Sequence, residues 1–283
     1  LKQEVMWARE YNDEKNVRHD VTWYFTSGSM GQGWSLDADF VYTYLNRDGS
    51  RFTDKAGYEK TLFADEFENR DYRLMQSIRY PGYTRRNNNV NTPYAPDFGY
   101  CVTGYQPIKW VIDDTSMDSN TAPCATSIPI LRYAEVLLNE AEAAARAGDK
   151  TLALEKLNQV RDRSLADPAT QTYKAGDFAN TKALVEAILW ERRIEFQGEG
   201  RRWEDIHRLA ADDLLPSGGI PAKIEYNNVK NQGAFVVGGE VKAEWFGNSK
   251  QFIPYTDKRF IWPIPLNDIL RNPTLAAQQN AGW

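Results

Sequence analysis

The pattern of hydrophobic and polar residues divides the chain at residue 129. Residues 1–128 hold no long run of helical period. Several segments within them are rich in Gly, Asn, Asp and Pro, as turns and loops are; these are 28–34, 46–50, 79–100 and 113–124. Most of this part is therefore expected to be irregular, with only short ordered elements.

Four short runs interrupt this irregular part. The aromatic or alternating runs VTWYF (21–25) and KWVI (109–112) are compatible with strands. The apolar residues of 37–45 lie at helical spacing, and those of 63–78 begin in the same way. The last two runs therefore predict short helices.

A continuous apolar stripe begins at residue 129. In residues 129–147 apolar side chains recur at i, i+3, i+4 and i+7, which predicts an amphipathic helix ending at Gly148. Asp149 opens a second helix, which runs to residue 164 with the same period. Because so few residues join them, the two helices are expected to lie antiparallel as a hairpin.

Two more helices are expected after a polar loop that starts at Asp167. They cover 181–200 and 202–211, and after Pro216 paired Gly and Asn residues return the chain to loop. Prolines in 259–275 exclude a long helix there. Alanines on the facing helices are typical of a tetratricopeptide-like hairpin. The predicted fold class is therefore mainly α, with tetratricopeptide-like helical hairpins, long irregular loops and a few short strands.

Composition narrows the function. Hydrophobic residues make up 42% of the 283 and charged residues 26%, as in a globular protein with a hydrated surface. The net charge of -5 argues against a nucleic-acid partner. Neither a membrane span nor an N-terminal signal peptide is expected, because no apolar run is long enough and the first residues are charged. The two cysteines, Cys101 and Cys124, are compatible with free thiols or with a disulfide.

Six segments, in this order, resemble the SusD/RagB family. They are DFVYTYLNRDGSRF (39–52), FENRDYRLMQSIRYPG (67–82), LRYAEVLLNEAEA (131–143), LNQVRDRS (157–164), ILWERRIEFQGEGRRWEDIHR (188–208) and WPIPLNDILRNPTLAAQQNAGW (262–283). The resemblance spans almost the whole chain and is to the C-terminal portion of the family. The chain departs from the family pattern in having Ala281 where a proline is usual.

This resemblance implies a surface glycan-binding lipoprotein of the outer membrane, without catalysis, cofactor or metal. It would deliver oligosaccharides to a SusC-like TonB-dependent transporter and be held by a lipid anchor outside this chain. The expected organisation is one SusD-like domain lacking its N-terminal half. Residues 1–128 would carry the ligand loops, 129–211 the tetratricopeptide-like helices, and 212–283 a loop-rich part packed on those helices.

The stretch ERRIEFQGEGRRWEDIHR (191–208) has three interpretations. A glycoside hydrolase could use Glu191 and Glu195, whose Cβ atoms would lie about 5–6 Å apart on one helix face. Nearby arginines would keep both acids ionised, however, whereas a general acid holds its proton near neutral pH. A metal site on His207 lacks a second histidine at helical spacing.

The third interpretation is structural and is preferred. The stretch would form an ion-pair clamp between helices, with Trp203 packed over the joint. Its members are Glu191, Arg192, Arg193, Glu195, Arg201, Arg202 and Asp205. Three acids elsewhere, Asp113, Asp114 and Asp118, lack the spacing of a calcium loop and are expected in a solvated loop.

A glycan site needs exposed aromatic rings beside polar side chains on loops with a rigid base. Two segments qualify, one with Trp23, Tyr24 and Trp34 and the other with Tyr83, Arg85, Asn87 and Asn88. The resemblance favours the first, and residues 244–252 have similar chemistry. Core packing remains the alternative for each tryptophan, and a solvated loop remains the alternative for the Arg-Asn run.

A tetratricopeptide-like adaptor for another protein is the alternative function. It would require an exposed groove lined by the helices of residues 130–164, and these helices are expected to be too apolar to leave such a groove open.

Overall fold

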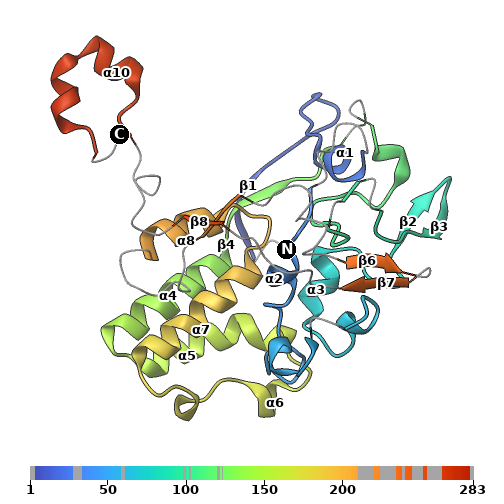
Figure 1. Cartoon of the computed structure of the whole chain (residues 1–283), viewed down its shortest axis with the longest axis horizontal. Helices are drawn as coiled ribbons and strands as arrows, with labels where there is room; N and C mark the ends of the chain where they lie inside the picture. The colour runs from blue at the N-terminus through green and yellow to red at the C-terminus, as the bar shows by residue number, and fades with distance from the viewer. Residues whose placement is uncertain are drawn as a thin grey trace. The chain divides into compact units, whose positions relative to one another are not determined.

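The structure is a computed structural model of the chain. It describes residues 4–27, 34–58, 61–97, 100–101, 103–119, 122, 124–209, 220–223, 234–237, 240–243, 251–253 and 263–280. The chain divides into two compact units, Leu1–Gly200 with Tyr226–Gly247 and Arg201–Glu225 with Asn248–Trp283. Three helices form the base of the first unit (Figure 1): α4 Tyr133–Ala147, α5 Lys150–Arg161 and α7 Thr181–Glu195.

The predicted helical hairpin is confirmed for α4 and α5, which pack against each other and against α7. Gly148 ends α4 in the left-handed region at φ 90°, and the Asp149 side chain accepts a hydrogen bond from the Leu152 amide at 3.0 Å. The predicted start of the first helix is wrong. Residues Ile128–Arg132 form strand β4, which pairs antiparallel with β1, Val5–Arg9.

The VTWYF run is a helix and not a strand. Helix α1, Val21–Thr26, buries Thr22 and Thr26 one turn apart, and the Thr22 hydroxyl accepts a hydrogen bond from the Ile112 amide at 3.0 Å. The alternation of apolar residues was misleading because the buried face is made of threonines. The strand predicted at KWVI is also wrong, because Trp110 sits in a turn at φ 71°.

The two short helices predicted in the first part are present but shorter than their patterns. Asp37 caps α2, Ala38–Val41, by accepting from the Phe40 amide at 2.7 Å, and α3 covers Tyr72–Ser77. Short 3-10 turns accompany them at η1 Phe52–Asp54, η3 Asp65–Phe67 and η4 Thr115–Met117.

A β-hairpin occupies part of the predicted loop 79–100. Strands β2, Thr84–Asn87, and β3, Val90–Pro93, pair in register from Thr84 opposite Pro93 to Asn87 opposite Val90. Asn88 and Asn89 form the turn with φ values of 48° and 64°. Two left-handed residues in succession are what a tight two-residue hairpin turn requires, and asparagine tolerates that conformation.

The chain beyond α7 also contains strands where loop was expected. After Pro216, β5 Ile220–Lys223 pairs with β8 Gln251–Ile253, and β6 Ala234–Val237 pairs with β7 Glu240–Ala243. The remaining elements are η5 Asp162–Ser164, α6 Pro168–Gln171, η6 Ala175–Asp177, α8 Arg201–Leu209, α10 Leu266–Arg271 and η10 Pro273–Gln278. The prediction that prolines exclude a long helix near the C-terminal end is confirmed by the six residues of α10.

An aromatic core holds the irregular part of the first unit together. Val41, Tyr44, Phe52 and Tyr105 are among its fully or almost fully buried members, and Arg70 lies over the Phe52 ring at 3.8 Å. The two cysteines are free and buried, which settles the alternative left open by the sequence. Among the described residues no helix is both long and apolar enough to cross a bilayer.

Candidate functional site

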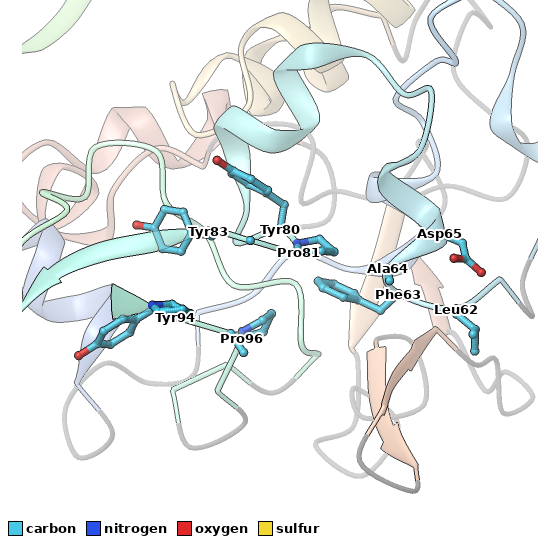
Figure 2. A pocket seen from close by; sticks show the side chains of 12 residues that line it. Leu62, Phe63, Ala64, Asp65, Tyr80, Pro81, Tyr83, Tyr94 and Pro96 are labelled. Carbon is cyan, nitrogen blue, oxygen red and sulfur yellow. The ribbon is translucent and has the colours of Figure 1, made fainter. Parts of the chain in front are cut away.

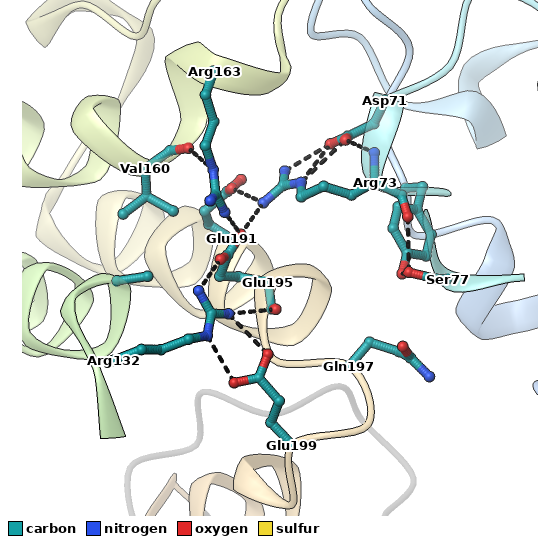
Figure 3. A network of polar contacts seen from close by, with 12 residues as sticks. Asp71, Arg73, Ser77, Arg132, Val160, Arg163, Glu191, Glu195, Gln197 and Glu199 are labelled. Carbon is teal, nitrogen blue, oxygen red and sulfur yellow. Dashed lines mark hydrogen bonds and ion pairs between the residues drawn. The ribbon is translucent and has the colours of Figure 1, made fainter. Parts of the chain in front are cut away.

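Glu191 and Glu195 of α7 lie in a buried ion-pair network (Figure 3). Arg73 of α3 donates to Glu191 at 2.6 Å and to Glu195 at 2.8 Å. Arg132, at the end of β4, donates to the other oxygen of Glu195 at 2.6 Å, and Arg163 of η5 also binds Glu195. The network therefore joins four segments that are far apart in the sequence.

A second layer extends the network beyond the end of α7. Glu199 accepts from Arg132 at 2.7 Å and from Lys109 at 2.6 Å. The indole of Trp110 donates to the Gly198 carbonyl at 3.1 Å, and Asp71 holds the guanidinium of Arg73 through two of its nitrogens. The turn after α7 is thus tied to the loop that carries Lys109 and Trp110.

These contacts keep Glu195 ionised. Burial would raise its pKa, but the guanidinium groups of Arg73, Arg163 and Arg132 outweigh burial and lower the pKa to about 2. A carboxylate in this state cannot donate a proton near neutral pH. Glu191 and Glu195 are 1% and 4% exposed, so neither faces a ligand.

The partners of these acids differ from those that the sequence indicated. Arg192 bonds to Asn139 of α4 at 2.7 Å and Arg193 lies over the Phe40 ring at 5.4 Å. Arg192 and Arg193 thus contact another helix and an aromatic ring. The arginines that bind Glu191 and Glu195 in the described part of the chain lie outside residues 191–208.

The rest of the predicted clamp lies in the second unit. Helix α8 carries Arg201, Arg202 and Asp205, and within it Arg208 pairs with the buried Asp205 at 2.8 Å. The side chain of Trp203 is 45% exposed. The side chain of His207 lies outside the described residues, and the clamp role of this helix stays a prediction.

The first aromatic segment is exposed. Tyr24 is 41% exposed and Trp34 is 56% exposed, while Trp23 is half-buried with its ring 5.3 Å from that of Tyr24. Phe25 meets Trp34 edge to face at 6.0 Å, so the structure brings Trp34 next to helix α1. We call Trp23, Tyr24 and Trp34 the aromatic platform. The intervening residues 28–33, and residues 244–250 of the third candidate segment, lie outside the described residues.

The second segment is only partly exposed. Arg85 is 1% exposed and pairs with Asp118 at 2.7 Å, and Tyr83 is 4% exposed with its hydroxyl bonded to Asp113. The expectation that these two side chains lie free on a loop is therefore wrong, because burial among acids fixes them. Asn88 is exposed at the hairpin turn, and Asn87 accepts from the Thr115 hydroxyl at 3.3 Å.

The three acids of residues 113–118 hold this hairpin in place. Asp113 and Asp118 bind Tyr83 and Arg85, and Asp114 accepts from Arg86 at 2.6 Å. Asp113 is exposed and the other two are partly buried, so these acids contact solvent as expected and also pair with the hairpin. Among the described residues no group of three His, Cys, Asp or Glu side chains could hold a metal ion.

A pocket of about 490 Å³ lies at the base of the hairpin (Figure 2). It is lined mainly by rings, from Phe63, Tyr80, Pro81, Tyr83, Pro93, Tyr94 and Pro96. Among its described lining residues the acidic one is Asp65. We call it the tyrosine pocket. Its residues were not singled out as a pocket from the sequence, although the YPGY turn at 80–83 was a usable signal.

The turn geometry explains how the tyrosines meet. The Tyr83 amide donates to the Tyr80 carbonyl at 2.9 Å, and Gly82 has φ 88°, as a turn with Pro then Gly at its centre requires. The two rings meet edge to face at 5.9 Å. Tyr94 joins them because its amide donates to the Tyr83 carbonyl at 2.9 Å.

These features define a class of protein. It is a mainly helical chain in which arginines bind the buried Glu191 and Glu195, and in which the aromatic platform and the tyrosine pocket lie on short or irregular segments. Residues 3–283 match the SusD family, and the chain belongs to that family. SusD-like protein P38 of Formosa agariphila is 28% identical over 219 residues, which cover 75% of this chain and 32% of that protein.

Solved structures share the fold. A SusD-like protein from Bacteroides fragilis NCTC 9343 superposes with a TM-score of 0.69 at 21% identity, covering 99% of this chain and 54% of that one. A SusD-like carbohydrate binding protein from Bacteroides vulgatus ATCC 8482 gives a TM-score of 0.51 at 16% identity, covering 95% and 48%. The chain therefore spans about half the length of these relatives. The tetratricopeptide-like description of its helices stays a prediction.

Proposed function

We propose that the protein binds oligosaccharides or polysaccharides without cleaving them, and that the aromatic platform is a contact surface for the glycan. The observation that carries this proposal is the exposure of Tyr24 and Trp34 beside a short helix in a chain of the SusD family. Large rings in contact with water are unfavourable unless a ligand covers them. The C–H faces of sugars suit such rings.

The hydrogen bonds that hold helix α1 favour a preformed site. Helix α1 is anchored by Thr22, and its C-terminal end is held by the buried Gln106, whose amide donates to the Phe25 carbonyl at 2.8 Å. A surface that is ordered before binding loses less conformational entropy when a ligand arrives. The matched protein from Bacteroides vulgatus is described as carbohydrate binding, which agrees with this proposal.

The cellular setting belongs to the same proposal. We infer a position at the outer-membrane surface, held by a lipid anchor, and delivery of the captured glycan to a SusC-like TonB-dependent transporter. The adaptor alternative has less support. The facing side chains of α4 and α5, such as Leu138, Ala141 and Leu157, are buried against one another and leave little surface for a peptide.

Titration with a panel of soluble oligosaccharides, followed by tryptophan fluorescence, tests the proposal. We expect at least one glycan to bind, and we expect W34A to weaken that binding about tenfold, since a well-placed aromatic contact contributes about 1.4 kcal/mol. W7A is the matched control, because Trp7 is 63% exposed on β1 and is not part of the platform. If no glycan in the panel binds, the proposed function is wrong.

A further inference from the structure

We propose that the tyrosine pocket is a second saccharide site and that it selects uncharged or amine-bearing sugars over sulfated or carboxylated ones. This inference rests on the proposed function, because it names the ligand class of one site within that function. The pocket is made of residues outside the aromatic platform.

The walls of the pocket are rigid. Pro81 and Gly82 fix the turn that carries Tyr80 and Tyr83, and Pro93 and Pro96 flank Tyr94. Prolines have a fixed φ and no amide hydrogen, so they present flat apolar surfaces and few backbone donors. Phe63 lies near Pro81 and is 4% exposed. Such walls suit the C–H face of a pyranose ring more than a highly solvated group.

Free polar groups lie at two ends of this apolar surface. The described part of the chain offers no hydrogen-bond partner to the hydroxyl groups of Tyr80 and Tyr94 or to the Asp65 carboxylate. Figure 2 shows the tyrosine hydroxyl groups toward one side of the pocket and Asp65 toward the other. Hydroxyl groups and a carboxylate are complementary to sugar hydroxyls, which both donate and accept.

The charges disfavour an anion. Among the described residues that line the pocket there is no arginine or lysine, whereas Asp65 is acidic. Two guanidinium groups lie against the tyrosine rings of the pocket but are buried. Arg79 is 3% exposed and Arg85 is 1% exposed. Arg79 donates to the Ala95 carbonyl at 3.1 Å and Arg85 pairs with Asp118, so neither can reach a ligand without leaving its partners. A sulfate or carboxylate in the pocket would lose water without gaining a counter-ion.

Isothermal titration of the full chain tests this inference. The probes are neutral oligosaccharides (fragments of glucan, xylan, mannan and galactan) and anionic ones (polygalacturonate fragments and sulfated galactan fragments). We expect a neutral probe to bind, and Y80F and Y94F each to weaken it about fivefold, which corresponds to loss of one hydrogen bond of about 1 kcal/mol. D65N should weaken the binding of the neutral probe and reduce the difference in affinity between the neutral and the anionic probes.

Two matched controls accompany these variants. Y133F alters a 44% exposed tyrosine on α4, and D54N alters an exposed aspartate on η1; both should leave affinity within twofold of the wild type. If a glycan binds but Y80F, Y94F and D65N behave like the controls, or if the anionic probes bind most tightly, the pocket inference is wrong and the proposed function stands. If no probe binds, both are wrong.

Discussion

Buried arginines connect distant segments of this chain. Arg70 donates to the Val41 and Tyr44 carbonyls, Arg73 binds Glu191 and Glu195, and Arg161 reaches the Gly49 carbonyl. Each arginine satisfies backbone or carboxylate groups that an irregular segment would otherwise leave unpaired. Such contacts allow the long, poorly patterned first part of the chain to hold a defined shape.

Replacement of Glu195 by Gln should destabilise the protein. Three guanidinium groups would lose a charged partner in a buried site, and the free energy of unfolding should fall by about 3 kcal/mol at neutral pH. Denaturant unfolding followed by circular dichroism measures this loss. The control is E186Q on the exposed side of α7, which should change stability by less than about 0.5 kcal/mol. Equal effects of the two substitutions would contradict the clamp.

Acidification provides a second check on the same carboxylate. The pKa of Glu195 is about 2 in the folded protein and 4.5 is its reference value, so the unfolded chain binds the proton more readily. The stabilisation is present above pH 4.5 and is lost as the pH falls toward 2. The pH dependence over this interval should be shallower in E195Q than in the wild type. The same dependence in both proteins would show that Glu195 is not ionised in the fold.

Glu66 should have the opposite pH dependence. It is fully buried, and although Tyr105 donates to both of its oxygens, burial raises its pKa from 4.5 to about 8. The folded state therefore keeps a proton that the unfolded state releases, and stability should decrease as the pH rises from 4.5 to 8. E66Q, which mimics the protonated form, should remove this decrease. An unchanged slope in E66Q would contradict a protonated Glu66.

At the residue scale the sequence indicated pairing but not the partners. The crowding of arginines and acids in 191–208 predicted locked carboxylates, yet Arg73, Arg132 and Arg163 lie outside that stretch. No local pattern relates residues separated by such distances along the chain. Burial of Tyr83 and Arg85 was missed for the same reason, because Asp113 and Asp118 belong to another loop.

At the scale of elements, glycines mark where the backbone must turn. Gly148 and Gly49 both adopt left-handed φ values, of 90° and 85°. A Cβ on Gly148 would meet nothing within 4 Å, whereas one on Gly49 would lie 2.5 Å from the Nη2 atom of Arg161. Arg161 is 2% exposed and lies over the Tyr173 ring at 3.6 Å, so it has little room to move.

The two glycines form a matched pair for mutation. G148A should lower the free energy of unfolding by about 1 kcal/mol, which is the cost of holding an alanine in the left-handed conformation. G49A should lower the free energy of unfolding by at least about 2 kcal/mol, because the new Cβ adds the same backbone strain and also displaces Arg161. Denaturation midpoints of the two variants measure the difference. Equal losses would mean that the Gly49 turn and Arg161 are not tightly packed together.

Elements with a clear helical period could be predicted, and those shaped by tertiary contacts could not. Helices α4, α5 and α7 follow their apolar stripes and caps. Helix α1 was mistaken for a strand because its buried side is Thr22 and Thr26, while Tyr24 is exposed and Trp23 and Phe25 are half-buried. That inversion is what places aromatic side chains at the surface. The hairpin of β2 and β3 could have been predicted from the Asn88-Asn89 turn.

At the scale of the whole molecule, the first unit carries two groups of surface aromatic residues, the aromatic platform and the tyrosine pocket. The aromatic platform is exposed, and the tyrosine pocket is a cavity whose described lining is mostly rings with the acid Asp65 at one side. The family match covers almost all of the chain, whereas the solved relatives are about twice as long. The division into 1–128, 129–211 and 212–283 stays a prediction.

The paired carboxylates predict binding without cleavage. Glycoside hydrolysis needs an acid with a raised pKa beside a second carboxylate, both facing the sugar. Among the described residues the carboxyl group with a raised pKa is Glu66, which is completely buried and accepts hydrogen bonds from the Tyr105 hydroxyl. Glu191 and Glu195 have suitable spacing but are buried and held by arginines.

Prolonged incubation of the full chain with an oligosaccharide that it binds should therefore return the oligosaccharide intact. Chromatography of the mixture and an assay for new reducing ends measure this, with a glycoside hydrolase of matching specificity as the positive control. Dilution should release the same oligosaccharide, because binding through ring stacking and hydrogen bonds forms no covalent bond. New reducing ends that increase with protein concentration, and that persist in E195Q, would require a catalytic acid outside the locked network.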